Sequence, residues 1–232
     1  MTAKIDIALV GATGAVGEAM IDILEQRDFP VGTLYPLASA RSAGKTIRFR
    51  GKSVTVQDLA EFDFAKAQIG LFSAGGDISA TYAPVAAAAG CVVVDNTSHF
   101  RRDEDIPLIV PEVNPHAVAG YTTRNIIANP NCSTIQMLVA LKPIYDAVGI
   151  SRINVATYQA VSGTGKEGIE ELATQMEEPF TILPMQAFCD KIGNWCNEIV
   201  SWEDGDNGIQ SKSTYQGHSA GKVKAFFRTE KS

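Results

Sequence analysis

The stretch Ile-Asp-Ile-Ala-Leu-Val-Gly-Ala-Thr-Gly-Ala-Val-Gly, residues 5–17, decides the fold class. Its first six residues are mostly apolar, and glycines follow at positions 11, 14 and 17. The next residues, 18–26, place Ala19, Ile23 and Leu24 for one helical face. This order predicts a strand, a loop and a helix, with backbone N–H groups at the helix start facing a pyrophosphate. An ordinary tight turn between strand and helix is the alternative.

Further apolar, β-branched runs alternate with helix-compatible segments along the chain. They predict strands over residues 34–38, near Ile47 and Val54, and over residues 69–73, 92–95, 126–128 and 153–158. Helices are predicted over residues 78–89, 135–145 and about 167–175. Because β and α units alternate, we predict an α/β fold with a Rossmann-type, mostly parallel sheet. The predicted domains are residues 1–131, which bind the nucleotide, and an α+β catalytic domain over residues 132–232.

Composition narrows the class of partner. The chain has 232 residues, of which 45% are hydrophobic, and this is enough for a substantial core. A net charge of -6 argues against nucleic acid and against an anionic membrane surface, and so favours small-molecule ligands. The N-terminus lacks a signal-peptide pattern and no apolar run approaches membrane-spanning length, which predicts a cytoplasmic location. Four cysteines without a Cys-x-x-Cys pair predict reduced thiols and no metal site.

The loop after the second predicted strand bears on the choice of nucleotide. An NAD-binding domain usually carries a carboxylate there, which binds the ribose hydroxyls. This chain instead has Ser39, Arg41 and Ser42. Because an arginine fork matches a phosphate group, the loop favours NADP. The alternative for Arg41 is a solvated loop arginine.

Cys132 follows a strand and a Pro-Asn turn and stands at the predicted start of a helix. A helix N-terminus stabilises a thiolate, which is the nucleophilic form of cysteine. The position therefore predicts covalent catalysis. Cysteines are also often small buried hydrophobic residues, and Cys91, within Gly90-Cys91-Val92-Val93, fits that alternative.

Four motifs in this order resemble the aspartate-semialdehyde dehydrogenase family: Gly11 to Gly17, Val110-Pro111-Glu112-Val113-Asn114, Asn129-Pro130-Asn131-Cys132-Ser133-Thr134, and Tyr158-Gln159-Ala160-Val161-Ser162-Gly163-Thr164-Gly165. The resemblance covers about residues 1–175. It implies NADP-dependent reductive dephosphorylation of aspartyl phosphate through a cysteine thioester, in the biosynthesis of lysine, threonine and methionine, by a homodimer. N-acetyl-glutamyl-phosphate reductase is the related alternative.

The resemblance also implies roles for single residues. Cys132 is the nucleophile, Gln159 orients the acyl group, and Arg101 binds the acyl phosphate or inorganic phosphate beside Asn131. His218, within Gly217-His218-Ser219, is the candidate general base. The NADP contacts implied by the motifs and the loop are Gly11, Thr13, Gly14, Ala15, Val16, Ser39, Arg41, Ser42, Ser162 and Gly163. The alternatives are a surface arginine at 101, a structural amide at 159 and a loop histidine at 218.

After about residue 175 the chain departs from the family pattern. We therefore expect the second domain to be truncated or divergent there. The Arg that binds a substrate carboxylate in the family has no counterpart seven residues before His218, where this chain has Ser211. A non-catalytic NADP-binding paralogue is thus a further alternative.

Overall fold

The computed structural model describes residues 3–157, 160–177, 200–203 and 210–213. The chain divides into two compact units, residues 1–132 and residues 133–232. The first unit contains the glycine motif and ends at Cys132.

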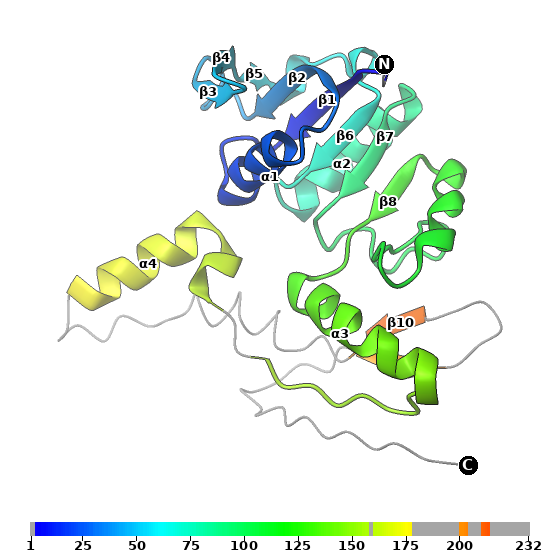
Figure 1. Cartoon of the computed structure of the whole chain (residues 1–232). Helices are drawn as coiled ribbons and strands as arrows, with labels where there is room; N and C mark the ends of the chain where they lie inside the picture. Colours follow the sequence, from blue (N-terminus) through cyan, green and yellow to red (C-terminus); the bar gives the residue numbers. More distant parts are fainter. Residues whose placement is uncertain (1–2, 158–159, 178–199, 204–209, 214–232) are drawn as a thin grey trace. The chain divides into compact units, whose positions relative to one another are not determined.

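A six-stranded sheet organises the first unit (Figure 1). Its order is β5-β2-β1-β6-β7-β8, and every neighbouring pair is parallel. The strands are β1 (Ile5–Val10), β2 (Val31–Ala38), β5 (Gln57–Asp58), β6 (Ile69–Phe72), β7 (Val92–Asp95) and β8 (Ile126–Ala128). The chain winds outward from β1 in one direction, then returns to start again at β6. This doubly wound topology confirms the predicted Rossmann-type sheet and puts its switch point between β1 and β6.

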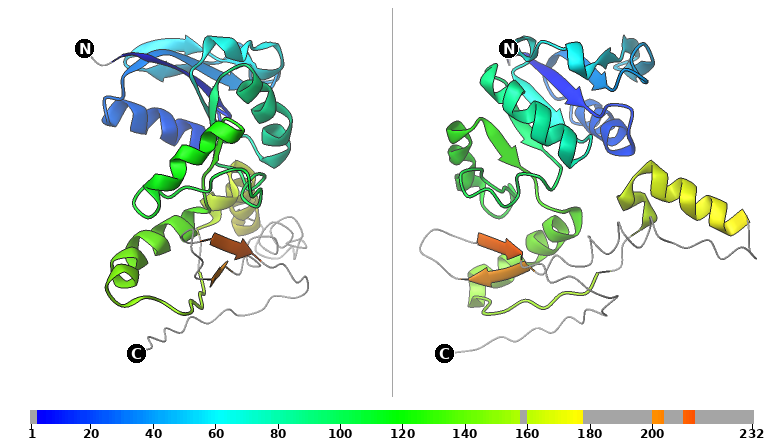
Figure 2. Two further views of the ribbon diagram at one scale, coloured as in Figure 1. Left: turned by 90° about the vertical axis from the view of Figure 1, so that its right-hand side faces the viewer. Right: turned by 180° about the vertical axis from the view of Figure 1, so that it is seen from behind.

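Both faces of the sheet are covered, because successive strand residues point to opposite sides. Ile7 and Leu9 pack with α1 (Ala15–Gln26) and with the hairpin of β3 (Thr46–Phe49) and β4 (Lys52–Thr55). Ala8 and Val10 belong to the other cluster, which includes α2 (Gly76–Ala88). Figure 2 shows α1 and α2 on opposite sides of the sheet. Two short turns, η1 (Leu59–Glu61) and η2 (Phe64–Lys66), join β5 to β6.

The buried face of α1 differs from the one expected. Leu24 is buried, but Ala19 and Ile23 are exposed, and the buried positions are Gly17, Ile21 and Leu24. These three lie on one helical face at spacings of four and three residues. The helix also starts at Ala15, three residues before the expected start, so that Gly17 is inside its first turn. The need to pack Gly17 against the loop after β1 selects this face.

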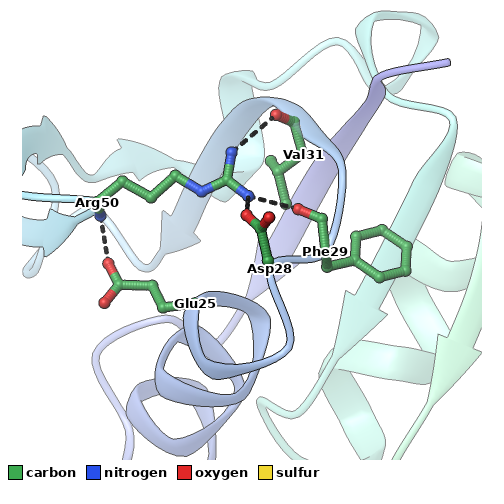
Figure 3. A network of polar contacts seen from close by, with 5 residues as sticks. All are labelled: Glu25, Asp28, Phe29, Val31 and Arg50. Atoms are coloured by element: carbon green, nitrogen blue, oxygen red, sulfur yellow. Dashed lines mark hydrogen bonds and ion pairs between the residues drawn. The ribbon is translucent and has the colours of Figure 1, made fainter. Parts of the chain in front are cut away.

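Arg50 fastens the β3–β4 hairpin to the turn between α1 and β2 (Figure 3). Its guanidinium donates to the carbonyl oxygens of Phe29 at 2.5 Å and Val31 at 3.5 Å, and pairs with Asp28 at 3.4 Å. Its backbone N–H donates to the carboxylate of Glu25. Arg50 has a φ of 49°, a left-handed conformation that is uncommon for a residue with a side chain. These contacts hold that conformation in place.

The long connection between β7 and β8 contains the 3-10 helix η3 (Pro115–Thr123) and is held by polar side chains. Asn114 accepts the N–H of Val110 at 2.8 Å and donates to the carbonyl of Leu108 at 2.9 Å. Arg124 pairs with Asp103 at 3.1 Å and with Asp105 at 3.3 Å. Irregular backbone needs partners such as the Asn114 side chain, because its polar groups are not satisfied by a helix or sheet ladder.

The second unit contains α3, which begins at the unit boundary (Cys132–Val148), the turn η4 (Val161–Thr164) and α4 (Lys166–Glu177). It also contains the antiparallel pair β9 (Val200–Glu203) and β10 (Gln210–Ser213). The strand expected over residues 153–158 is wrong, because residues 154–157 lie in no strand. A β-branched run forms a strand only when a neighbour supplies backbone partners. No helix among the described residues is long and apolar enough to cross a membrane.

Candidate active site

The carboxyl ends of the six parallel strands meet at one edge of the sheet, and most of the predicted site residues of the first unit follow those ends. The glycine motif follows β1, residues 39–45 follow β2, and Arg101 lies in the connection that follows β7. Asn131 and Cys132 follow β8. Ligands of open α/β sheets bind in the crevice outside this edge, at the switch point. Topology therefore brings these residues to the edge where a ligand is expected.

Gly11 and Gly17 are required by close backbone approach. Gly11 has a φ of 89°, and a Cβ atom there would lie 2.8 Å from the carbonyl oxygen of Ser73. A Cβ atom at Gly17 would overlap the carbonyl oxygen of Gly11. The glycines thus let α1 approach the ends of β1 and β6, which is the packing that a dinucleotide-binding turn needs.

The first turn of α1 fits a pyrophosphate. Its N-cap residue is Gly14, and no side chain caps the helix. The first N–H groups of a helix have no intrahelical acceptor and carry the positive end of the helix dipole. Ala15 and Val16 are exposed in this turn, and Thr13 is half-buried beside it. An anion can therefore approach these backbone groups.

The loop after β2 carries two positively charged side chains, Arg41 and Lys45. Arg41 and Ser39 are exposed, whereas Ser42 is buried. The Ser42 N–H donates to the Ser39 carbonyl at 2.8 Å, and its hydroxyl accepts from the Lys45 ammonium at 3.4 Å. The loop is adjacent to the glycine motif, because the N–H of Gly11 donates to the carbonyl of Leu37 at the end of β2. Lys45 is a second positive charge in this loop that the sequence patterns did not single out.

Arg101 is half-buried, and its contacts differ from those of a solvated surface arginine. Its Nε donates to the carbonyl oxygen of Asn129 at 2.9 Å, and its Nη2 donates to that of Asn96 at 3.1 Å. The side chain is thus fixed between the loops that follow β7 and β8. The nearby acidic Asp103 and Asp105 pair with Arg124.

Cys132 is exposed and is the first residue of α3, which confirms the predicted position of a thiol at a helix start. Asn131 precedes it and is half-buried. Cys91 contrasts with it, because Cys91 is completely buried and burial raises the pKa of its thiol to about 11. Of these two cysteines, Cys132 therefore presents the accessible sulfur.

The remaining predicted site residues belong to the second unit. Gln159 and His218 lie outside the described residues. Ser162 and Gly163 lie in η4, where the N–H of Gly163 donates to the carbonyl of Ala160 at 3.0 Å. Their predicted roles in catalysis and in NADP binding stay predictions.

A buried polar cluster around Asp95 was not found from the sequence. Asp95, Ser79 and Thr97 are joined by hydrogen bonds, and Asn96 contacts Asn129. The one available signal was a carboxylate at the carboxyl end of a buried strand, followed by Asn-Thr-Ser.

Among the residues that the structure describes, no group of three or more His, Cys, Asp or Glu side chains is arranged to hold a metal ion.

The parallel sheet, its order and its glycine loop define a dinucleotide-binding α/β domain. Comparison with known proteins agrees, since residues 6–121 match the model described as "Semialdehyde dehydrogenase, NAD binding domain". Residues 141–224 match "Semialdehyde dehydrogenase, dimerisation domain". The chain belongs to the semialdehyde dehydrogenase family.

Within this family, the chain is similar to curated aspartate-semialdehyde dehydrogenases. The chain is 67% identical over 175 residues to aspartate-semialdehyde dehydrogenase 2 of Vibrio cholerae, covering 75% of this chain and 52% of the relative. It is 63% identical over 187 residues to aspartate-semialdehyde dehydrogenase of Shewanella violacea, covering 81% of this chain and 55% of the relative. The predicted resemblance is thus confirmed. The chain spans about half the length of these relatives.

Solved structures show the same similarity. Aspartate semialdehyde dehydrogenase II from Vibrio cholerae, complexed with ASA, has a TM-score of 0.75 and 65% identity, over 76% of this chain and 53% of the other. Aspartate semialdehyde dehydrogenase with NADP from Candida albicans has a TM-score of 0.59 and 27% identity, over 69% of this chain and 52% of the other.

Proposed function

We propose that this chain is an NADP-dependent aspartate-semialdehyde dehydrogenase, which converts aspartyl phosphate to aspartate semialdehyde and inorganic phosphate through a thioester on Cys132. The observation that carries the proposal is the position of the exposed Cys132 at the start of α3, directly after β8. That position is at the sheet edge where the glycine motif begins α1. The close relatives with this name, and the match to a dimerisation domain, support the activity and a homodimer.

NADP fits the residues at this edge. The uncapped first turn of α1 would bind the pyrophosphate, and Arg41 and Ser39, exposed in the next loop, would bind the ribose phosphate. No carboxylate stands among residues 39–45 to favour a free ribose. By the family resemblance, Ser162 and Gly163 are further proposed NADP contacts. NADPH, when bound, supplies the hydride that converts the thioester to the aldehyde.

The chain's own residues would perform the acyl transfer. The Cys132 thiolate attacks the acyl carbon of aspartyl phosphate, the carbon–oxygen bond to phosphate breaks, and the leaving phosphate takes the bonding electrons. Arg101 binds the phosphate as its charge develops, because a guanidinium fork matches phosphate oxygens. Gln159 orients the acyl carbonyl, supported by Asn131, and His218 accepts the thiol proton. The roles of Arg101, Gln159, Asn131 and His218 follow the family resemblance.

The test is the reverse reaction on the purified chain, namely phosphate-dependent reduction of NADP with aspartate semialdehyde. Cys132→Ala should abolish turnover and leave NADP binding unchanged, whereas Cys91→Ala should retain turnover. N-acetyl-glutamate semialdehyde serves as the competing substrate. Persistent activity in Cys132→Ala would refute the covalent role, and a preference for the acetylated substrate would refute the assigned specificity.

A further inference from the structure

Asp95 is the last residue of β7, and its side chain is completely buried. Its Oδ1 accepts from the Ser79 hydroxyl at 2.7 Å and from the Thr97 N–H at 3.1 Å. Its Oδ2 accepts from the Thr97 hydroxyl at 2.7 Å. A buried carboxylate is stable only when hydrogen bonds replace its hydration. These three bonds therefore fix Asp95 between α2, which carries the buried Ser79, and the turn that follows β7.

The turn after β7 is in turn fixed to the loops on both sides of it. The N–H of Asn96 donates to the carbonyl of Phe72, at the end of β6, at 2.9 Å. The carbonyl of Asp95 accepts from the N–H of Asn129 at 2.8 Å, and the Asn96 side-chain oxygen accepts from the Asn129 amide at 2.6 Å. The turn thus sets the relative positions of the chain after β6 and the chain after β8.

The Arg101 guanidinium is attached to the same two residues. Its Nε donates to the Asn129 carbonyl and its Nη2 to the Asn96 carbonyl. Because a guanidinium is planar, two acceptors at fixed positions determine the direction in which the group faces. Both acceptors belong to the segments that Asp95 and its partners hold. Asp95 is therefore connected to Arg101 through one residue on each side, Asn96 and Asn129.

We infer that Asp95, Ser79 and Thr97 form a positioning group that orients Arg101 for the phosphate of the substrate. None of the three needs to touch the substrate for this role. The inference deepens the proposed function and rests on it only for the identity of the ligand. The geometric part of the inference is that the Thr97 hydroxyl helps to fix the orientation of the Arg101 guanidinium. This part depends only on the hydrogen bonds.

The kinetic test compares Thr97→Val, which removes the hydroxyl and keeps the shape, with Thr97→Ser, which keeps the hydroxyl. We expect Thr97→Val to raise the KM for inorganic phosphate about tenfold and to change the KM for NADP less than about twofold. Thr97→Ser should restore the phosphate KM. Thr81→Val is the matched control, since Thr81 lies on α2 and its hydroxyl donates to the Asp77 carbonyl at 3.0 Å.

A second readout does not depend on activity. In a ¹⁵N spectrum the Nε–H signal of Arg101, assigned by its loss in Arg101→Lys, should exchange slowly with solvent because it donates to Asn129. Thr97→Val should make this exchange faster, and Thr97→Ser and Thr81→Val should not. An unchanged Arg101 signal in a folded Thr97→Val variant overturns the inference. If the chain proves inactive but the signal responds as expected, the positioning role stands and the proposed reaction fails.

Discussion

Gly17, in the first turn of α1, lies so close to the carbonyl oxygen of Gly11 that a Cβ atom at position 17 would overlap it. The same Cβ atom would lie 2.8 Å from the Cα atom of Ala12. The obstacles are backbone atoms, which cannot rotate away as the end of a side chain can. The approach of α1 to the end of β1 thus depends on the absence of one methyl group.

Gly17→Ala should therefore lower the free energy of unfolding by about 1–3 kcal/mol, which is typical of overpacking. It should also weaken NADP binding, because the first turn of α1 must move away from the end of β1. Thermal denaturation and a binding titration measure the two effects. Gly76→Ala is the control, since a Cβ atom there would have its nearest neighbour at 3.9 Å. Equal stability of the two variants would contradict the packing argument.

Replacement of Arg41 tests the choice of nucleotide. Arg41→Ala should weaken NADPH binding about tenfold or more and leave NADH binding nearly unchanged, because only NADPH carries the ribose phosphate. Fluorescence titration with both nucleotides gives the ratio. Arg48→Ala, at an exposed position of β3, is a control for the loss of one positive charge. Equal weakening for NADPH and NADH would show that Arg41 does not contact this phosphate.

The buried Cys91 thiol should make the free energy of unfolding fall at alkaline pH. Burial raises the pKa of its thiol from 9.0 to about 11, so the folded chain holds this proton more tightly than the unfolded chain. The resulting stability is complete below about pH 9 and is lost as pH rises through about 11. The loss amounts to about 2–3 kcal/mol.

Denaturant unfolding between pH 8 and pH 11 measures this dependence. Cys91→Ala should be less stable than the parent at pH 8, because a small cavity replaces the sulfur. Its free energy of unfolding should fall less steeply with pH than that of the parent. Parallel slopes in the two proteins would assign the alkaline loss to other groups.

Variants of Arg50 distinguish the contribution of its side-chain contacts to stability from that of its left-handed backbone conformation. Arg50→Gly removes the guanidinium bonds to Phe29 and Val31 but suits a φ of 49°, and should cost about 1–2 kcal/mol of stability. Arg50→Ala removes the same bonds but keeps the left-handed strain of about 1 kcal/mol that any side chain carries at this φ, so it should be less stable than Arg50→Gly by about that amount. Asp28→Asn should leave the denaturation midpoint unchanged, because the Asp28 side chain is fully exposed. An Arg50→Ala variant as stable as Arg50→Gly would contradict the assigned strain.

Local patterns predicted the elements whose signals lie within a few residues. The apolar run before Gly11 and the Pro-Asn turn before Cys132 indicated the first strand and the start of α3, because strand and helix boundaries depend on nearby residues. The strand expected over residues 153–158 was wrong because strand formation depends on a partner. The exposed Ile23 was misplaced because α1 is oriented by its contact with the loop after β1.

The site was predicted less completely. The family resemblance implied that Arg101 binds a phosphate, but the Asn96 and Asn129 carbonyls that hold its side chain belong to the backbone, which has no sequence signature. Asp95 and Ser79 are 16 positions apart and meet only because α2 packs on β7. Arg50 likewise joins segments about 20 residues away. Such bonds arise from tertiary structure.

The two outermost strands of the six-stranded sheet, β5 and β8, have a consequence for solubility. β5 has only two residues and β8 only three, and the carbonyl and N–H of Ala128 on β8 are already paired with the segment 107–109. A long unpaired edge would serve as a template on which strands of other molecules add. These edges offer very little backbone to a second molecule, so the sheet of residues 1–132 should resist edge-to-edge aggregation at high concentration.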